Sequence, residues 1–340
     1  MRRHFLASLS VVTIATAIGS LMASVSGQTQ PAKALINTTG QTKTWTLPRT
    51  VDDQPDLQGV WSFATMAPLE RPTEFVGKEF LTDEELAEVR KKDESYIDFA
   101  SNGGKGNSTG SYNKWWFEPG PSSRRTSLIV DPHDGRLPPL TSQGQKRLDD
   151  KREAMERSAG PEDRSATDRC ILGFTAGPPM MPDLYNSTVQ VFQTHDYFVI
   201  YNEMVHNARI VPLDRGAHGV LRQWSGDSRG HWEGDTMIID TINLTDEWTG
   251  TQHLAPTLDQ NTRLIERFRR TGPETLDYEF TVDDPTIWTR PWTARIPWAK
   301  MQSQLYEYAC HEGNYSMAHI LSGARARDQA VSDAAKKGRR

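Results

Sequence analysis

The pattern of hydrophobic and polar positions changes near residue 187. Beyond it, short apolar runs alternate with turn residues such as Gly272-Pro273 and Asp283-Asp284-Pro285. The runs occupy 188–193, 197–204, 208–213, 220–224, 235–243, 262–269, 275–282, 292–296 and 303–309. Short strands at this spacing, without helices between them, are typical of an antiparallel meander. The pattern therefore predicts a mainly β fold, in which the meander closes as a barrel or half-barrel.

Two helices are predicted before these strands, with a third after them. Thr82 and Glu85 have the spacing of a capping box, which predicts a helix that runs to about Asp93. Either residue of Thr141-Ser142 caps a second, charged helix through about Arg157. We expect these helices, and a short one over 317–329, to lie at the periphery of the β structure.

The segment between the second helix and the strands, residues 158–183, is rich in Gly, Pro and Asp. This composition predicts a long ordered loop rather than a helix or strand.

An aromatic cluster, Trp115-Trp116-Phe117, follows a Gly- and Ser-rich loop earlier in the chain, and we expect it to cover an edge of the core.

The first residues have the composition of a secretory signal. Arg2 and Arg3 precede an apolar run over 5–22, and small residues up to Gly27 suit cleavage. No later run reaches the roughly 18 apolar residues that a membrane span needs. We therefore expect export through the general (Sec-type) route, to the periplasm or the medium, and no membrane span in the mature chain.

These patterns divide the chain into one main domain with terminal segments. The predicted parts are a signal peptide (1–27), an extended lead-in (28–54), a single β-rich domain (55–330) and a basic tail (331–340). Within the domain, 55–186 is rich in loops and helices, and 187–316 is the β-meander.

The chain contains two cysteines, Cys170 and Cys310. In an oxidising compartment an even number of cysteines favours a disulfide bond. A bridge would hold His311 and Glu312 against the 158–183 loop, where they would line the mouth of a barrel. Two alternatives remain open at this stage: Cys310 acts as a nucleophile or metal ligand beside His311, or the segment is only a helix-entry turn.

Three predicted strands each place one ionisable side chain on the face that apolar residues mark as buried: His206, Asp240 and Glu266. A lone buried charge is costly, so three on neighbouring strands indicate a shared polar feature. A histidine–carboxylate pair in a pocket can act as acid and base, which makes these three the candidate catalytic residues. The alternatives are a buried network that joins strands, or a turn at 205–207 that moves His206 outside.

Two other groups of polar residues give weaker indications of a functional site. Glu203 and Arg209 share the parity opposite to His206, which predicts a cross-strand ion pair on the outer face. His231, Glu233 and Asp235 are spaced like metal ligands on a strand, but Glu233-Gly234-Asp235 favours a turn. We expect no metal and no cofactor.

The opening apolar segment contains Gly59-Val60-Trp61, which resembles the first strand of lipocalin-like barrels. The resemblance implies a barrel that Trp61 helps to complete and that holds a small apolar or aromatic molecule. Side chains expected to line that pocket are Trp61, Phe198, Met204, Phe268, Tyr278, His311 and Glu312.

Longer phrases resemble a large family of exported bacterial proteins with no assigned function. They are RRTSLIVDP (124–132), GDSRGHWEGDT (226–236), ERF (266–268), FTVDDP (280–285), TRPWT (289–293) and YACHEGNY (308–315). The resemblance covers roughly residues 55 to 325. It implies export and one continuous unit, and it carries over no catalytic residue.

The net charge is −5, and acidic and basic residues are interspersed, so nucleic acid is not an expected partner. Three functions remain: an enzyme with lyase, isomerase or hydrolase chemistry on an apolar or aromatic molecule, a non-catalytic carrier, and an envelope interaction module. The first two need a roomy pocket. The third predicts a filled core with an exposed aromatic patch, for which Trp115 and Trp116 are the candidates.

Overall fold

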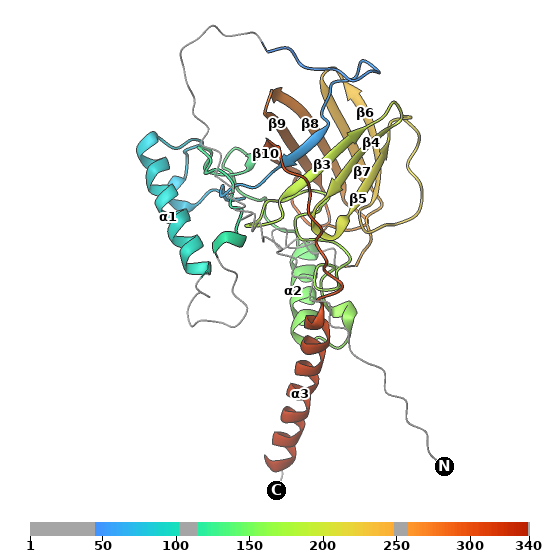
Figure 1. Cartoon of the computed structure of the whole chain (residues 1–340). Coiled ribbons are helices and arrows are strands. Elements are labelled where there is room, and N and C mark those ends of the chain that lie inside the picture. Colours follow the sequence, from blue (N-terminus) through green and yellow to red (C-terminus); the bar gives the residue numbers. More distant parts are fainter. Residues whose placement is uncertain (1–44, 102–113, 248–257, 339–340) are drawn as a thin grey trace, which may run out of the picture. The chain divides into compact units, whose positions relative to one another are not determined.

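The computed structural model describes residues 45–101, 114–247 and 258–338. The predicted signal peptide and the first part of the predicted lead-in lie outside the described residues. Within the described ranges, the fold is one antiparallel sheet of ten strands with three α-helices beside it (Figure 1). The predicted mainly antiparallel β architecture is confirmed.

The sheet contains nine strands in a continuous path and one short branch. The strands are β1 (Gly59–Ser62), β2 (Ile129–Asp131), β3 (Thr188–Gln193), β4 (Tyr197–Asn202), β5 (Ala208–Pro212), β6 (Asp227–Glu233), β7 (Thr236–Ile242), β8 (Arg263–Gly272), β9 (Thr275–Asp283) and β10 (Trp292–Met301). Their order is β5-β4-β3-β1-β10-β9-β8-β7-β6, and β2 pairs with β10. Among the described strands, β5 and β6 end the path without pairing with each other, so the sheet is not closed into a barrel.

Two predicted strands are absent, and one strand was not predicted. The runs 220–224 and 303–309 form no strand, and Val220 and Leu221 are exposed. Strand β6 lies where none was expected. Its buried positions include Ser228 and Gly230, which give no hydrophobic signal, although the backbone pairs with β7 over seven positions.

Aromatic side chains make up much of the hydrophobic core against the sheet. The ring centroids of Phe268 and Tyr278 lie 4.9 Å apart, and those of Tyr278 and Trp298 lie 5.1 Å apart. These three residues, with Trp61 and Phe198, are at most 1% exposed. Burying each large apolar side chain stabilises the fold by about 2–3 kcal/mol relative to exposure.

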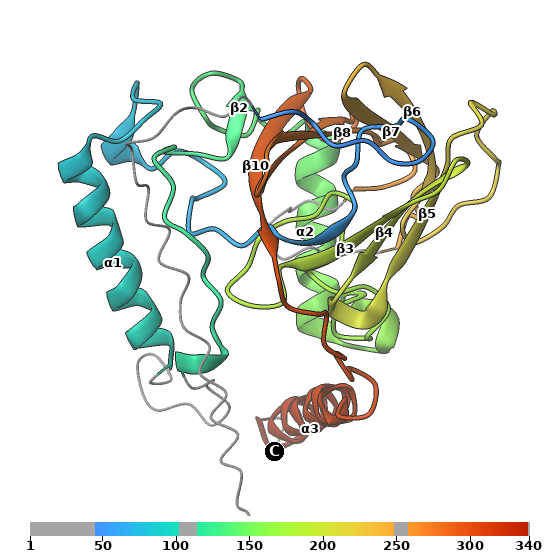
Figure 2. The ribbon, with the colours of Figure 1, turned by 45° about the horizontal axis from the view of Figure 1, so that its top comes forward.

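The first helix, α1 (Asp83–Ser101), lies beside the sheet on the side of β2 (Figure 2). The predicted capping box is confirmed: Glu85 accepts a hydrogen bond from the Thr82 amide at 2.8 Å, and Thr82 Oγ1 accepts one from the Glu85 amide at 3.3 Å. Only Leu86 and Ile97 of this helix are buried. It is therefore a peripheral element, as the sequence predicts.

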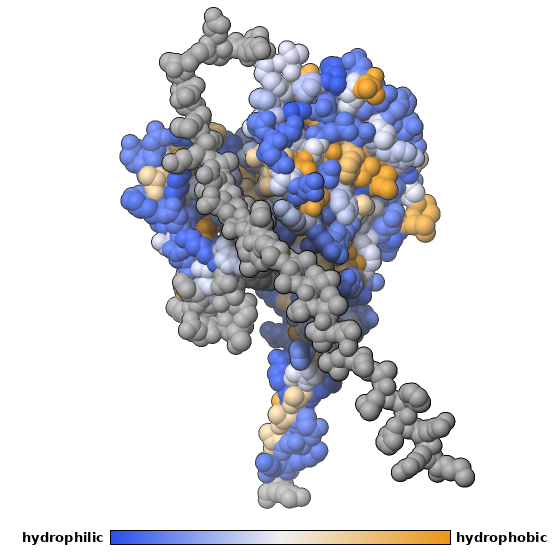
Figure 3. Space-filling model, viewed as in Figure 1, coloured by the Kyte–Doolittle hydropathy of each residue, from blue (hydrophilic) through white to orange (hydrophobic). Residues whose placement is uncertain are grey.

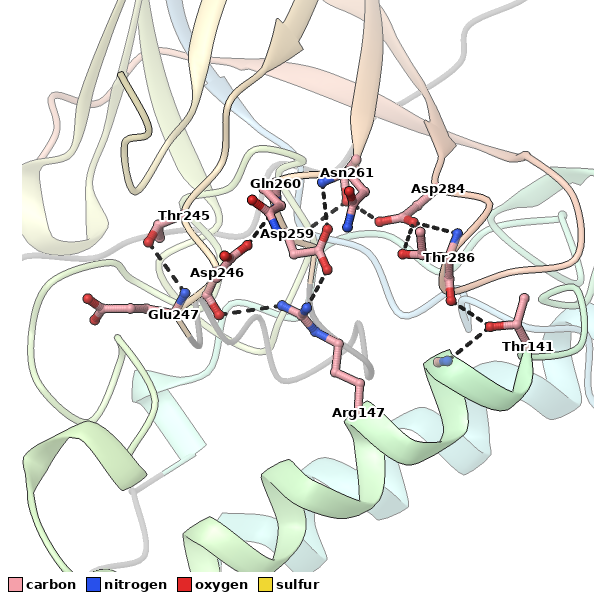
Figure 4. Close-up of polar contacts among 12 residues, drawn as sticks. Thr141, Arg147, Thr245, Asp246, Glu247, Asp259, Gln260, Asn261, Asp284 and Thr286 are labelled. Atoms are coloured by element: carbon pink, nitrogen blue, oxygen red, sulfur yellow. Dashed lines mark hydrogen bonds and ion pairs between the residues drawn. The ribbon is translucent and has the colours of Figure 1, made fainter. Parts of the chain in front are cut away.

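The second helix, α2 (Ser142–Arg157), is fixed to two turns at the end of the sheet (Figure 4). Thr141 caps it by accepting a hydrogen bond from the Gly144 amide at 2.9 Å. The Thr141 hydroxyl also donates to the Thr286 carbonyl at 2.5 Å. One turn further, Arg147 forms an ion pair with Asp259, which is 1% exposed.

The third helix, α3 (Tyr315–Gly338), begins close to its predicted start but runs past the predicted end, into the expected basic tail. Arg325 donates to the Ala159 carbonyl at 2.9 Å and Arg327 to the Glu156 carbonyl at 3.1 Å. In the described part of the chain, no helix is both long and apolar enough to cross a membrane.

The irregular segment 158–187 is ordered by side chains that enter the core. Met180 and Met181 are at most 1% exposed. The predicted disulfide is confirmed: Cys170 and Cys310 are bonded, with Cα atoms 5.8 Å apart. The bridge connects this segment to the chain between β10 and α3, and Asn314 adds a hydrogen bond of 2.9 Å to the Asp168 carbonyl.

Candidate functional site

Glu266 lies inside the fold, as its strand parity predicts. It is 0% exposed on β8 and forms a two-pronged ion pair with Arg209 of β5. The Tyr278 hydroxyl donates to Glu266 Oε1 at 2.7 Å, and the Met180 amide donates to that hydroxyl at 3.1 Å. Glu266 thus belongs to a buried network that joins three strands to the 158–187 segment.

Burial and the neighbouring charges shift the pKa values of two groups in this network, Arg209 and Tyr278. Burial disfavours the Arg209 guanidinium, but the charge and hydrogen bonds of Glu266 outweigh it and raise the pKa of Arg209. Burial, followed by the negative charge of Glu266, raises the pKa of Tyr278 well above its usual range. Tyr278 therefore stays protonated and acts as a hydrogen-bond donor.

The predicted outer-face pair of Glu203 and Arg209 was wrong, because the hairpin register pairs Ile200 with Arg209 and turns both inward. The connection is a 3-10 turn, η4 (Met204–His206), in which Val205 has φ 61° and His206 has φ 53°. The strand alternation stops at this turn, so parity carried from β4 into β5 assigns the wrong face.

Asp240 lies on the outer face of β7, contrary to its predicted parity. It accepts hydrogen bonds from Arg263 at 3.0 and 2.8 Å, and His218 Nε2 lies 3.7 Å from its carboxylate. The apolar run Met237-Ile238-Ile239 has hydrophobic residues on both faces, so the pattern could not identify the buried one.

His206 is exposed in η4, which is the turn that the sequence left open as an alternative. The three candidate catalytic residues therefore do not come together: one lies in the core, one on the outer face and one at the end of the sheet. The Tyr308 amide donates to His206 Nε2 at 3.3 Å, which places the proton of the neutral ring on Nδ1.

A pocket of about 450 Å³ brings His206 together with His311 and Glu312. We call it the disulfide pocket, because the bonded Cys170 and Cys310 form part of its wall. His311 and Glu312 line this pocket beside Cys170 and Ile171 of the 158–183 loop, but the opening is not the mouth of a barrel.

A second pocket, of about 400 Å³, adjoins the first at Glu307 and Tyr308. We call it the aromatic pocket. Its lining residues are Trp116, Glu118, Tyr185, Asn186, Glu203, Tyr306, Glu307 and Tyr308. The chain after β10 forms one wall as it passes the β4–β5 hairpin (Figures 1 and 2), where the Tyr306 amide donates to Glu203 Oε1 at 3.3 Å.

Four of the eight described non-glycine residues with positive φ line these two pockets. Val205, His206 and Cys170 line the disulfide pocket with φ of 61°, 53° and 55°, and Asn186 lines the aromatic pocket with φ 53°. Positive φ is unfavourable for a β-branched residue such as Val205. Such strain persists only where the surrounding structure holds it, and it often marks functional sites.

The other predicted ligand-binding residues lie elsewhere. Trp61, Phe198, Phe268 and Tyr278 are packed in the core, and Met204 is buried against Thr175. None of them lines a described pocket. The aromatic pocket was missed because its walls come from four distant segments. The one local signal is the cluster Trp115-Trp116-Phe117, for which the sequence favours a core cover or, in an interaction module, an exposed patch. Trp115 and Trp116 are 69% and 53% exposed.

No group of three His, Cys, Asp or Glu side chains within the described ranges is arranged to hold a metal ion. Of the residues with metal-like spacing in the sequence, His231 lies with its Nε2 3.0 Å from Glu233 on β6.

Comparison with known proteins finds no family model that matches the chain and no curated protein with significant sequence similarity. The resemblance to exported bacterial proteins and to lipocalin-like barrels stays a prediction. The site is therefore interpreted from its own geometry.

Proposed function

We propose that this chain is an exported protein that binds a small organic molecule in the disulfide pocket and the adjoining aromatic pocket. One observation carries the proposal: ionisable and aromatic side chains from distant segments converge on two connected pockets with strained walls. Ligand sites have this character, a concave surface with a few converging polar groups. The disulfide bond supports export, since such bonds persist in oxidising compartments.

The proposal includes a half-barrel shape for the sheet. Arg209 on the terminal strand β5 reaches Glu266 on β8, which requires strong curvature. Gly230 on β6 has no side chain, so Val211 and Leu213 can pack against its backbone. A Cβ atom at position 230 would lie only 2.7 Å from Leu213. These contacts support two end strands that face each other without hydrogen bonding.

The disulfide pocket also offers groups for acid–base chemistry. In the tautomer whose Nε2 accepts from the Tyr308 amide, His206 offers Nδ1–H as a donor, and His311 with Glu312 supplies a second histidine and a carboxylate. A histidine near neutrality can donate or accept a proton from a bound molecule. Lyase, isomerase or hydrolase chemistry would rest on these residues rather than on Asp240 or Glu266.

A thermal-shift screen of small organic molecules tests the binding proposal, with His206→Ala and Tyr306→Ala as variants. Both side chains are exposed, so the fold should survive their removal. A molecule present at about 100 times its Kd stabilises the protein by about 2.7 kcal/mol. We expect hits on the wild type that weaken at least tenfold in one or both variants.

Tyr197→Ala is the matched control, because Tyr197 is 46% exposed at the other end of β4 and lines no described pocket. Hits that bind all three variants as tightly as the wild type, or a screen without hits, would contradict the proposal.

A second candidate, an interaction module, is favoured by the packed core and by the stacked pair Trp115 and Trp116, whose ring centroids lie 4.2 Å apart. Figure 3 also shows hydrophobic side chains gathered over the sheet. Among the described residues of the sheet, Phe192 on β3 and Ile210 on β5 are 42% and 61% exposed. Trp115→Ala separates the two candidates: it should weaken a protein interaction but leave small-molecule binding nearly unchanged.

A further inference from the structure

The aromatic pocket is lined mainly by aromatic rings and carboxylates. Four rings line it, those of Trp116, Tyr185, Tyr306 and Tyr308. Three carboxylates, Glu118, Glu203 and Glu307, line it as well, and no Lys or Arg is among the described residues of the wall. The pocket therefore presents aromatic faces and negative charge together.

The negative charge is not neutralised within the described structure. Glu203 is only 7% exposed, and one of its oxygens accepts the hydrogen bond from the Tyr306 amide. Neither Glu203 nor Glu118 forms an ion pair with another described residue. Partial burial, followed by the nearby charge of Glu203, raises the pKa of Glu118. Glu118 and Glu203 repel each other beside the aromatic rings, so a cation bound between them would be stabilised.

The side chains that line the pocket indicate which kind of cation it would bind. Aromatic faces attract ammonium and quaternary ammonium groups through the ring quadrupole, and they give such groups an apolar surface for their alkyl substituents. A bare metal ion needs several oxygen ligands close to one point. The described carboxylates form no such group.

We propose that the aromatic pocket selects a small organic cation, with its ammonium or quaternary ammonium group held among the rings and beside Glu203 and Glu118. This inference rests on the proposed function, because it names the ligand class of the same site. The remaining body of the ligand would extend past Glu307 and Tyr308 toward the disulfide pocket and His206.

Isothermal titration of the full mature chain with two probes tests the charge requirement. The probes are choline and 3,3-dimethylbutan-1-ol, which has nearly the same shape but carries carbon in place of the charged nitrogen. We expect choline to bind at least tenfold more tightly at pH 7.5 and low salt. Its affinity should fall as the pH drops through the raised pKa of Glu118, because the protonated carboxyl carries no charge.

Two variants locate the binding. Glu203→Gln keeps an acceptor for the Tyr306 amide and removes the charge, and Trp116→Ala removes a ring that is 53% exposed. We expect each to weaken choline binding about tenfold. Glu84→Gln on α1 and Tyr197→Ala on β4 are the matched controls, and each should bind choline like the wild type.

The outcomes separate this inference from the proposed function. Equal affinity for both probes, with loss in Trp116→Ala, would overturn the charge requirement and leave small-molecule binding in place. Choline binding that is unchanged in both site variants would overturn the inference, as would displacement of choline by Ca²⁺ at equal concentration. If neither probe nor any molecule of the screen binds, both proposals fail.

Discussion

The buried position of Glu266 could be predicted from the residues around it in the sequence. Its neighbours Leu264 and Phe268 are apolar at alternate positions, so the parity identifies one face, and the side chain is fully buried there. Asp240 lies in an apolar run without alternation, and the same reasoning places it on the wrong face. A parity prediction is therefore reliable only where the opposite face is polar.

The buried network predicts a large effect for a small change. Glu266→Gln removes the negative charge but leaves Arg209 buried, and it should lower the free energy of unfolding by about 3–5 kcal/mol. Chemical denaturation measures the difference. Glu279→Gln is the control, because Glu279 pairs with Arg295 at 2.6 Å on the more exposed face, and its loss should cost about 0–1 kcal/mol. Equal losses in the two variants would argue against a special role for burial.

At the scale of elements, α2 brings a lysine into a partly buried position. Burial, with the charge of Arg147, lowers the pKa of Lys151 to about 8, although Asp259 and Asp246 oppose the shift. The folded state therefore binds the Lys151 proton less tightly than the unfolded state does. This costs stability below pH 8, and the cost disappears as the pH rises toward the ordinary value of 10.5.

Lys151→Met should consequently stabilise the protein at pH 7, by about 1 kcal/mol after discounting for partial exposure. The gain should shrink between pH 8 and 10.5, because deprotonation then removes the cost in the wild type. Urea denaturation across this range measures it. Lys146→Met serves as the control, since Lys146 is exposed and pairs with Asp150 at 2.7 Å. A gain that does not depend on pH would point to packing instead of charge.

The β4–β5 hairpin shows why an element can be predicted while its faces are not. Both strands were expected, but the turn η4 contains two residues with positive φ, and no glycine marks it. The turn places Glu203 at the aromatic pocket, His206 at the disulfide pocket and Arg209 in the core. Three roles within seven residues thus depend on a backbone conformation that the local sequence disfavours.

At the scale of the whole molecule, the disulfide joins residues 140 positions apart. It holds the 158–187 segment against the chain that precedes α3, and both contribute to the disulfide pocket. In the chain-entropy model, a loop of this length stabilises the folded state by about 4–5 kcal/mol.

The double variant Cys170→Ala/Cys310→Ala should lose roughly that amount and should also bind hits from the small-molecule screen less tightly, because the pocket wall is no longer fixed. Denaturation and titration under oxidising conditions measure the two effects. The wild type treated with a reductant is the control, because its denatured chain is also no longer cross-linked. Its stability and its affinity for the hits should match those of the double variant. A variant with unchanged stability and binding would show that packing alone holds the two segments.

Local sequence features were enough to predict the class of the fold, both capped helices, most strands, the disulfide and the inward position of Glu266. These features depend on local periodicity, on capping chemistry or on a single pair of cysteines, so they can be inferred without knowing how the chain folds back. Three features could be seen only in the folded chain: the core is filled, Asp240 faces outward, and the two pockets lie beside the β4–β5 turn. Their walls come from segments that are distant in sequence and brought together by strand register, a strained turn and the disulfide.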